Sequence, residues 1–402
     1  MCTNFFRLNK TNLTEKLLVY PGQPALSLLA ALSALLLVLG LCLPTAKASG
    51  QSSLASKFDI VESPSLYHRA INTARAEIEM LMAAGAPGVS VAVGVDGELV
   101  WAEGFGFANV EHQVPVNTET RFRIGSISKT MTSIAMAQLY ERGVINLDEP
   151  IQTYLPTFPI KEKGIVTLRL LASHRAGIRH YLPDGSDNLI TRHYDNVVDG
   201  LEIFSNDPLI AAPGEQYYYS SYGYNLLSAV LQKASGVKFL TLMRESVWSP
   251  LQLIETVADH TDYIIMNRAA PYYRRGDQLI NAPAVDNSYK LAGGGFLSTP
   301  SDLVSFGFGV FNSGIIKNET LTLLLSPPQL PDGEIADQNY GLGWVDFYED
   351  GSWFGHTGGS VGGTALFMVN PEAGVVMGLV CNLTGCFDGH QGLRQIGEYF
   401  VQ

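Results

Sequence analysis

Short strand patterns stand at both ends of this chain, with helical patterns between them, and this constrains the fold most. Residues 89–101 alternate around Asp96-Gly97, a dipeptide that favours a tight hairpin. Four more short runs, joined by short turns, lie near the C-terminus: 340–347, 352–356, 364–370 and 375–382. Because short turns favour antiparallel neighbours, the two ends are predicted to build one antiparallel sheet.

Helical spacing of apolar residues predicts the elements that accompany this sheet. Residues 63–84 and 127–141 carry such spacing and end at glycines, and 391–402 suit a closing helix. Between 150 and 290 the helical patterns are split by proline and glycine. We therefore predict an α/β plus all-α architecture with helices flanking the sheet. Its α/β domain takes residues 60–125 and 335–402, and its mainly helical inserted domain takes 126–334.

Composition narrows the function. With 402 residues, 46% hydrophobic and 16% charged, the chain is typical of a globular protein and not of a disordered, collagen-like or coiled-coil one. Its net charge of −12 comes without a basic stripe, which argues against nucleic acid as a partner. A small-molecule or peptide site is the remaining expectation.

The N-terminus reads as a targeting segment. Residues 25–43 carry no charge, and Arg7, Lys10 and Lys16 precede them, which favours a cytoplasmic N-terminus. Ala46-Lys47-Ala48 has the small-x-small form of a signal-peptidase site. Residues 1–48 are thus predicted to be a cleaved signal peptide or an uncleaved signal anchor. Either alternative predicts export, to the periplasm or outside the cell, with inner-membrane anchoring through 25–43 in the second.

Cysteine and histidine spacing bears on disulfides and metals. Beyond residue 48 only Cys381 and Cys386 remain, and a disulfide and a buried free Cys381 both fit the pattern. No CxxC is present, and the eight histidines form no HxH or HExxH pair. We therefore predict no metal and no cofactor.

A first group of candidate catalytic residues is the S-x-x-K tetrad from Ser126 to Lys129, at the start of the predicted helix 127–141. Positions i and i+3 share a helix face, so the two side chains can meet. The helix N-terminus favours developing negative charge, and a neutral lysine could accept the serine proton. The alternative is that Ser126 only caps the helix.

Two further elements carry polar side chains. Tyr219-Ser220-Ser221 follows a Pro-Gly break, although its neighbouring tyrosines also suit a packing cluster. His356-Thr357-Gly358-Gly359 ends a predicted strand, where small residues allow a close backbone approach or simply terminate the strand. Residues 358–362 also match the G-x-S-x-G nucleophile elbow, but that motif needs a following helix, and 364–370 suit a strand.

In order and spacing, these three elements resemble the serine β-lactamase-like and penicillin-binding family, relatives of class C β-lactamases and DD-peptidases. The LACTB-type active-site serine proteins are the most similar group, and the resemblance covers about residues 65–400. It rests on the nucleophile segment 122–129, on Ser173–Tyr181 (SHRAGIRHY) and on Asp286–Thr299 (DNSYKLAGGGFLST).

The resemblance implies a role for each matched position. Ser126 would be the acylated nucleophile, Lys129 its proton acceptor and Tyr219 the proton relay to the leaving group. The backbone amides of Ser126 and Gly359 would form the oxyanion hole. The implied substrate-binding residues are Ser221, His356, Thr357 and Gly358. The implied fold, a sheet with an all-helical domain and the site at their junction, agrees with the topology predicted above.

Two positions depart from the family pattern. Ser221 stands where the family has asparagine, and His356 stands where many members have lysine. Both changes weaken contacts to a β-lactam. We therefore expect a serine hydrolase that acylates itself on a peptide, amide or ester. The alternatives are a β-lactamase and a non-catalytic protein that binds peptides or cell-wall fragments.

Other residues near these motifs carry structural expectations. His174 and His180 are expected to orient the loop 171–181 by hydrogen bonds. Gly293–Gly295 are expected to allow a tight turn near the site. Tyr340 and Trp344 suit either the substrate cleft or the core.

Overall fold

The structure is a computed structural model that describes residues 61–62, 66–330, 332–336, 339–387 and 391–401. The predicted signal peptide or anchor, 1–48 with its apolar run 25–43, lies outside these residues and stays a prediction. Among the described helices, none alone is long and apolar enough to cross a membrane. The pair Ser221–Ser235 and Phe239–Trp248 has the necessary length and composition only when the two are taken together, and they are bent by 83° at the break between them.

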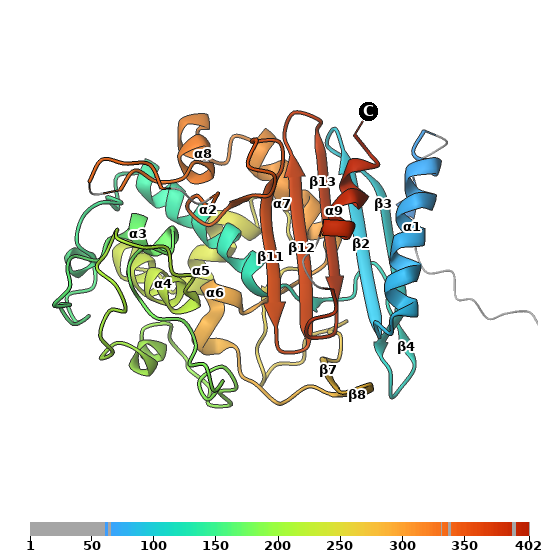
Figure 1. Ribbon diagram of the computed structural model, residues 1–402, viewed down its shortest axis with the longest axis horizontal. Coiled ribbons are helices and arrows are strands. Elements are labelled where there is room, and N and C mark those ends of the chain that lie inside the picture. The colour runs from blue at the N-terminus through green and yellow to red at the C-terminus, as the bar shows by residue number, and fades with distance from the viewer. Residues whose placement is uncertain (1–60, 63–65, 331, 337–338, 388–390, 402) are drawn as a thin grey trace, which may run out of the picture. The chain divides into compact units, whose positions relative to one another are not determined.

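The large sheet joins both ends of the chain, as predicted. Its antiparallel order is β1-β3-β2-β13-β12-β11-β10, with β4 paired to β3 (Figure 1). The strand bounds are β1 Val61–Glu62, β2 Gly88–Val95, β3 Glu98–Asn109, β4 Val114–Pro115, β10 Val345–Asp346, β11 Phe354–Ser360, β12 Gly363–Asn370 and β13 Val375–Cys381. The β2–β3 hairpin turns at Asp96 and Gly97, both with positive φ, because this tight turn requires left-handed backbone.

Both faces of the sheet are buried. Along β12, Phe367 and Val369 join one apolar core, while Leu366 and Met368 join the other, as the two-residue period of a strand requires. The first core includes α7 (Pro300–Asn312), and the second includes α1 (His68–Ala83) and α9 (Gln391–Glu398). Figure 1 shows α1 and α9 beside the sheet and α7 behind β11 and β12, with α2, α3, α4, α5, α6 and α8 gathered beyond β11.

Between the two ends of the sheet, the chain is largely helical, with a few short strands. The helices are α2 Ser128–Glu141, α3 Leu168–Ala172, α4 Ser221–Ser235, α5 Phe239–Met243, α6 Leu291–Gly294, α7 and α8 Asn318–Leu325. The 3-10 or π turns are η1 Gly125–Ile127, η2 Ile151–Thr153, η3 Asp199–Ile203, η4 Arg244–Trp248 and η5 Ser288–Lys290. The strands are β5 Phe122–Arg123, β6 Val257–Ala258, β7 Tyr272–Arg275, β8 Gln278–Asn281 and β9 Phe296–Ser298. The boundaries of the predicted helical domain, 126–334, stay a prediction.

Two predicted strands have different bounds. Only Val345–Asp346 of the run 340–347 is a strand, because Leu342 N bonds to Leu324 O instead of to the sheet. β11 continues past His356 to Ser360, since its glycines pair with β12. A Cβ on Gly358 would lie 2.0 Å from Ile124 O, so glycine is needed for the close approach of the Ser126 segment and not for a strand end. Of the two alternatives for the cysteines, the structure has the Cys381–Cys386 disulfide.

Candidate active site

Ser126 sits where the start of α2 meets the strand β11. It lies in η1, which leads directly into α2, and its side chain is half-buried. Gly125 before it has φ +50°, and a Cβ there would lie 2.6 Å from Gly359 O. Glycine is therefore required at 125, and this contact brings Ser126 next to the sheet edge.

Lys129 is fully buried one helical turn after Ser126. Its Nζ lies 2.9 Å from Ser126 Oγ, 3.2 Å from Ser221 Oγ and 2.5 Å from Gly293 O. No carboxylate pairs with it among the described residues. Burial, with a smaller contribution from the charge of Lys290, lowers the pKa of Lys129 well below the usual lysine value. The site therefore favours a neutral amine, which can act as a base.

Tyr219 also contacts the serine oxygen. Its Oη donates to Ser126 Oγ at 2.7 Å, and Lys129 Nζ lies 4.8 Å from its ring centre. Burial raises the pKa of Tyr219 well above its ordinary value, although the hydrogen bond to Ser126 lowers it in part. The phenol therefore stays protonated and can pass a proton but cannot serve as the initial base.

Two histidines hold the segment that carries Tyr219. The backbone N–H of Ser220 donates to His174 Nδ1 at 3.1 Å, and that of Ser221 donates to His180 Nδ1 at 3.2 Å. Burial lowers the pKa of His180 to about 4 and that of His174 well below its ordinary value, so both rings are neutral acceptors at neutral pH. Both histidines belong to the loop 171–181, which they were predicted to orient by hydrogen bonds, and these two bonds tie the loop to Ser220 and Ser221.

His356 is buried and belongs to a chain of hydrogen bonds that fixes its tautomer. Its Nε2 lies 3.0 Å from Tyr340 Oη, and its Nδ1 lies 2.6 Å from Thr357 O. Since His174 Nδ1 accepts, its Nε2 donates to Tyr340 Oη at 3.0 Å, and Tyr340 in turn donates to His356 Nε2. Burial first, and then the charge of Lys129, lower the pKa of His356 to about 3. His356 therefore carries no charge with which to hold a substrate.

We expect Tyr340→Phe to lower the free energy of unfolding by about 1–3 kcal/mol, because it leaves two buried imidazole nitrogens without a partner. Thermal or urea denaturation measures the loss. The matched control is Tyr348→Phe, whose hydroxyl bonds to Glu398 on the exposed surface and whose loss should change stability by less than about 0.5 kcal/mol. Equal stability of both variants would contradict the proposed hydrogen-bond chain.

A cavity of about 470 Å³ opens onto the serine. Ser126, Ser221 and Gly359 line it, whereas His356, Thr357 and Gly358 do not. Ser126 and Gly359, whose amides were predicted to form the oxyanion hole, thus face one cavity. From β11 it is Gly359 and Ser360, rather than the three residues before them, that border this space.

One cluster of side chains in the described residues could hold a metal. His193, His260 and Asp262 each offer a ligand atom, all within 4.8 Å of one another. The two histidines border a different cavity, of about 380 Å³, which Ser126 does not line. Histidine spacing along the chain gave no sign of this cluster, because His193 lies far along the chain from His260 and Asp262.

Sequence reasoning missed the roles of three groups around the site, although it named Tyr340 as a candidate for the cleft or the core. The Gly293 carbonyl holds Lys129, Tyr340 links the two histidines, and the Lys290 side chain lines the cavity. A carbonyl leaves no residue-type signal, although the Gly293–Gly295 run was the available hint. A Cβ on Gly293 would lie 2.9 Å from Ser221 O, so this position needs glycine for α6 to approach α4.

Comparison with known proteins gives a consistent result. The profile of the family described as Beta-lactamase matches residues 74–399. The human serine beta-lactamase-like protein LACTB, mitochondrial, is 34% identical over 74% of each chain. The octameric penicillin-binding protein homologue from Pyrococcus abyssi superposes with a TM-score of 0.69, at 25% identity over 82% of this chain and 76% of that one. D-amino acid amidase from Ochrobactrum anthropi, complexed with L-phenylalanine amide, shares the fold with a TM-score of 0.70, at 22% identity over 83% of this chain and 97% of that one.

Proposed function

The chain belongs to the beta-lactamase family, and from that premise we propose that it is a serine hydrolase that cleaves a peptide, amide or ester through an acyl-enzyme. One observation carries the proposal. Ser126 Oγ lies 2.9 Å from a buried amine, Lys129 Nζ, and 2.7 Å from the Oη of the half-buried Tyr219, while its cavity remains open. A serine placed between a base and a proton relay has the arrangement of an activated nucleophile.

The contacts of Lys129 match the hydrogen-bonding capacity of a neutral amine. Such an amine has two N–H donors and one lone pair. Gly293 O and Ser221 Oγ can accept from the two donors, which leaves the lone pair for the Ser126 hydroxyl. Ser221 thus contributes what the family's asparagine would otherwise supply, a partner that holds the lysine.

The proposed reaction has two steps. In acylation, Lys129 takes the Ser126 proton, Oγ bonds to the substrate carbonyl, and the amides of Ser126 and Gly359 stabilise the oxyanion. The bond to the leaving group then breaks as Tyr219 protonates it, and the Lys129 ammonium restores the phenol proton. In deacylation, a water gives its proton to the same groups and attacks the ester carbon, which releases the acid and restores the Ser126 hydroxyl.

The neutral state of His356 favours amides and esters over β-lactams. Family members with lysine at the position of His356 have a fixed cation that can bind a β-lactam carboxylate. The buried, neutral His356 of this chain provides no such cation. The amidase named above, whose structure holds an amino acid amide, shows that this fold accommodates amide chemistry.

The test is a substrate panel that contains anilides, aryl esters and a chromogenic β-lactam. We expect wild-type protein to hydrolyse both esters and anilides, with a burst of leaving group from the aryl esters, because an activated ester acylates the serine faster than water removes the acyl group. A higher kcat/KM for the β-lactam would support the β-lactamase alternative instead. Binding of cell-wall fragments with no turnover of any substrate would support the non-catalytic alternative.

A further inference from the structure

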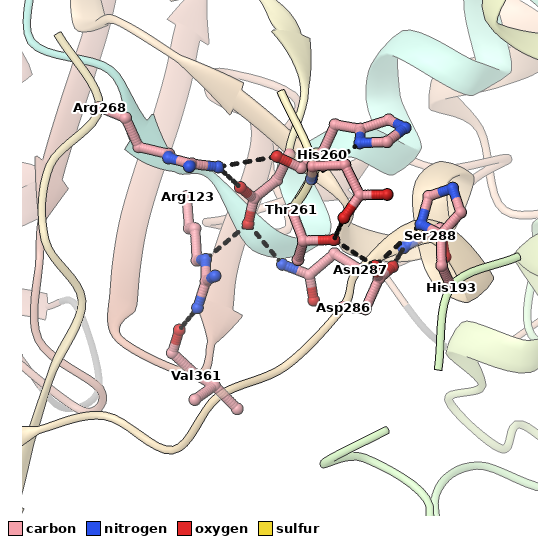
Figure 2. A network of polar contacts seen from close by, with 11 residues as sticks. Arg123, His193, His260, Thr261, Arg268, Asp286, Asn287, Ser288 and Val361 are labelled. Carbon is pink, nitrogen blue, oxygen red and sulfur yellow. Dashed lines mark hydrogen bonds and ion pairs between the residues drawn. The ribbon is translucent and has the colours of Figure 1, made fainter. Parts of the chain in front are cut away.

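Two imidazoles and a carboxylate meet beside the cavity of about 380 Å³ that Ser126 does not line. The ring centres of His193 and His260 are 4.5 Å apart, and the ligand atoms of both rings and of Asp262 lie within 4.8 Å of one another. Figure 2 shows the two rings next to each other, at the edge of a polar network away from Arg123. Imidazole and carboxylate are ligand types that zinc and similar divalent ions prefer.

A buried carboxylate fixes the tautomer of His193. Asp286 is 2% exposed, and its Oδ2 lies 2.9 Å from His193 Nδ1 and accepts from Thr261 Oγ1 at 2.6 Å (Figure 2). Because a carboxylate accepts hydrogen bonds and does not donate them, Nδ1 carries the ring proton. In the neutral ring, Nε2 therefore keeps a free lone pair. Histidine ligands in metal sites are typically held in this way, by a carboxylate behind the ring.

His260 also presents a lone pair. Its Nδ1 accepts from the Asp262 N–H at 3.2 Å, and this bond lies at the protein surface. A metal ion that takes the lone pair displaces one long hydrogen bond, whose N–H can donate to water instead. The residue is held independently of that bond, since its carbonyl accepts from Arg268 Nη1 at 2.9 Å and its ring stacks on Tyr263 (Figure 2).

The distances within the cluster suit a small ion. Ligand atoms around a tetrahedral zinc lie about 3.3 Å apart, because each zinc–nitrogen bond is about 2.0 Å long. Atoms that are within 4.8 Å of one another need to approach by at most about 1.5 Å to reach this spacing. The side chain of Asp262 is exposed, so it can rotate toward the two rings without disturbing packed neighbours. Water can occupy the remaining coordination positions.

The charges around the cluster also favour a cation. Asp195 and Asp286 form ion pairs with His193, and with no lysine or arginine of the described residues. The nearby Arg268 already pairs with another carboxylate. Lys238 borders the same cavity, but its side chain is exposed, so solvent and salt screen its charge. A divalent ion would balance the acids that have no such partner.

The cluster joins two long connections that have no helix or strand of their own. His193 lies between α3 and η3, and His260 and Asp262 lie between β6 and β7. Residues between 180 and 189, in the first of these connections, line the Ser126 cavity. An ion bound at the cluster would cross-link the two connections and restrain this wall of the Ser126 cavity from outside.

We propose that His193, His260 and Asp262 bind a divalent metal ion of the zinc class, with water completing its coordination, and that this ion cross-links the two connections. Asp286 is the positioning residue, because it holds His193 with the Nε2 lone pair free. Histidine spacing along the chain did not predict a metal. The inference goes beyond the proposed hydrolase function and does not depend on it, since its tests need no substrate.

The experiment measures zinc binding to the full chain without an affinity tag, after a chelator has removed bound metals. Calorimetry should show a site with a Kd of about 1 µM or below. The Tm should rise by about 3–5 °C at a zinc concentration about a hundred times Kd, because the ion binds the folded chain. The chain also contains Cys2 and Cys42, whose thiols can bind zinc, so variants are needed to assign the site.

Ligand variants assign the zinc to this cluster. His193→Gln and His260→Gln should each weaken zinc binding at least about a hundredfold, because each removes one ligand nitrogen. His112→Gln is the matched control, since it replaces an exposed histidine between β3 and β4 and should leave Kd unchanged. Asp262→Asn, at an exposed position, serves if a histidine variant does not fold. Equal zinc affinity in wild-type protein and these ligand variants would overturn the proposal.

Asp286→Asn tests the positioning role. It should weaken zinc binding about tenfold to a hundredfold relative to wild-type protein, whatever its effect on the Tm of the metal-free chain. Cobalt at saturating concentration should give the same visible spectrum in wild-type protein and Asp286→Asn, since the ligands are unchanged. The spectrum should differ in His193→Gln, which lacks one ligand. Wild-type zinc affinity in Asp286→Asn would exclude this role.

Hydrogen exchange tests the cross-link. With zinc bound, amides in 190–196 and 258–264 should exchange at least about tenfold more slowly, because local opening must then break the metal bonds. Asp262→Asn should reduce this protection. Unchanged exchange in the zinc-bound protein would reject the cross-link. If zinc does not bind saturably at all, the site is refuted, and His193 is then a protonated histidine that pairs with Asp286 and Asp195.

Discussion

Replacing Ser126 with alanine is expected to lower kcat/KM for ester and anilide hydrolysis by at least about a thousandfold, because no acyl-enzyme can then form. The substitution removes one oxygen from a half-buried position, so the fold should be retained and thermal stability should change little. Steady-state hydrolysis of the best substrate, measured at equal concentrations of folded protein, checks this.

Ser360→Ala is the matched control for that experiment. Ser360 lies in the other serine motif of the chain, G-x-S-x-G at 358–362, and it also borders the cavity. The structure places it at the end of β11, paired with Gly363 in a hairpin, where a nucleophile elbow would need a following helix. We expect kcat/KM of Ser360→Ala to fall less than about tenfold. A larger loss in Ser360→Ala than in Ser126→Ala would indicate that Ser360, and not Ser126, is the nucleophile.

Removing the amine of Lys129 is expected to reduce kcat/KM by at least about a hundredfold, the range of a lost general base. Lys129→Met keeps an unbranched apolar side chain one atom shorter than lysine, and it has no basic nitrogen that can accept the Ser126 proton. In wild-type protein the base must be neutral, so activity should fall as pH drops through the pKa of Lys129. That pKa lies well below the ordinary lysine value, because burial disfavours the ammonium.

Lys129→Arg separates basicity from charge. A guanidinium stays protonated throughout the accessible pH range, so this variant should be as inactive as Lys129→Met and should show no recovery at high pH. Activity in the arginine variant would mean that Lys129 acts only as a fixed cation. Wild-type rates in the methionine variant would exclude it as the base.

Much of the fold could be predicted because its signals are local. The Asp96-Gly97 turn, the short apolar runs of β12 and β13 and the spacing of α1 and α2 are each set within a few residues. The bounds of β11 were harder, since Gly358 and Gly359 read as a strand end. Gly358 is small because Ile124 O presses on it from the Ser126 segment, a contact that no local pattern reveals.

The residues of the candidate site also fall into those with a local sequence signal and those whose role depends on packing. Ser126 and Lys129 could be paired from their spacing on one helical turn, and Tyr219 was matched through the family resemblance. The positions of the Gly293 carbonyl and of the Lys290 side chain depend on how α6 and η5 pack against their neighbours, which the sequence does not show. His356 was expected at the substrate-facing edge, and the structure instead turns it toward Tyr340, where a hydrogen bond fixes it.

The most direct measurement is the location of a trapped acyl group. Wild-type protein incubated with a slowly deacylated ester or a penicillin is digested and mapped by tandem mass spectrometry. The account predicts one added acyl group on the peptide that contains Ser126, and the fragment ions should assign it to Ser126 itself. The same peptide of Ser126→Ala should carry no acyl group. An adduct on any other side chain, or turnover without a covalent intermediate, would contradict it.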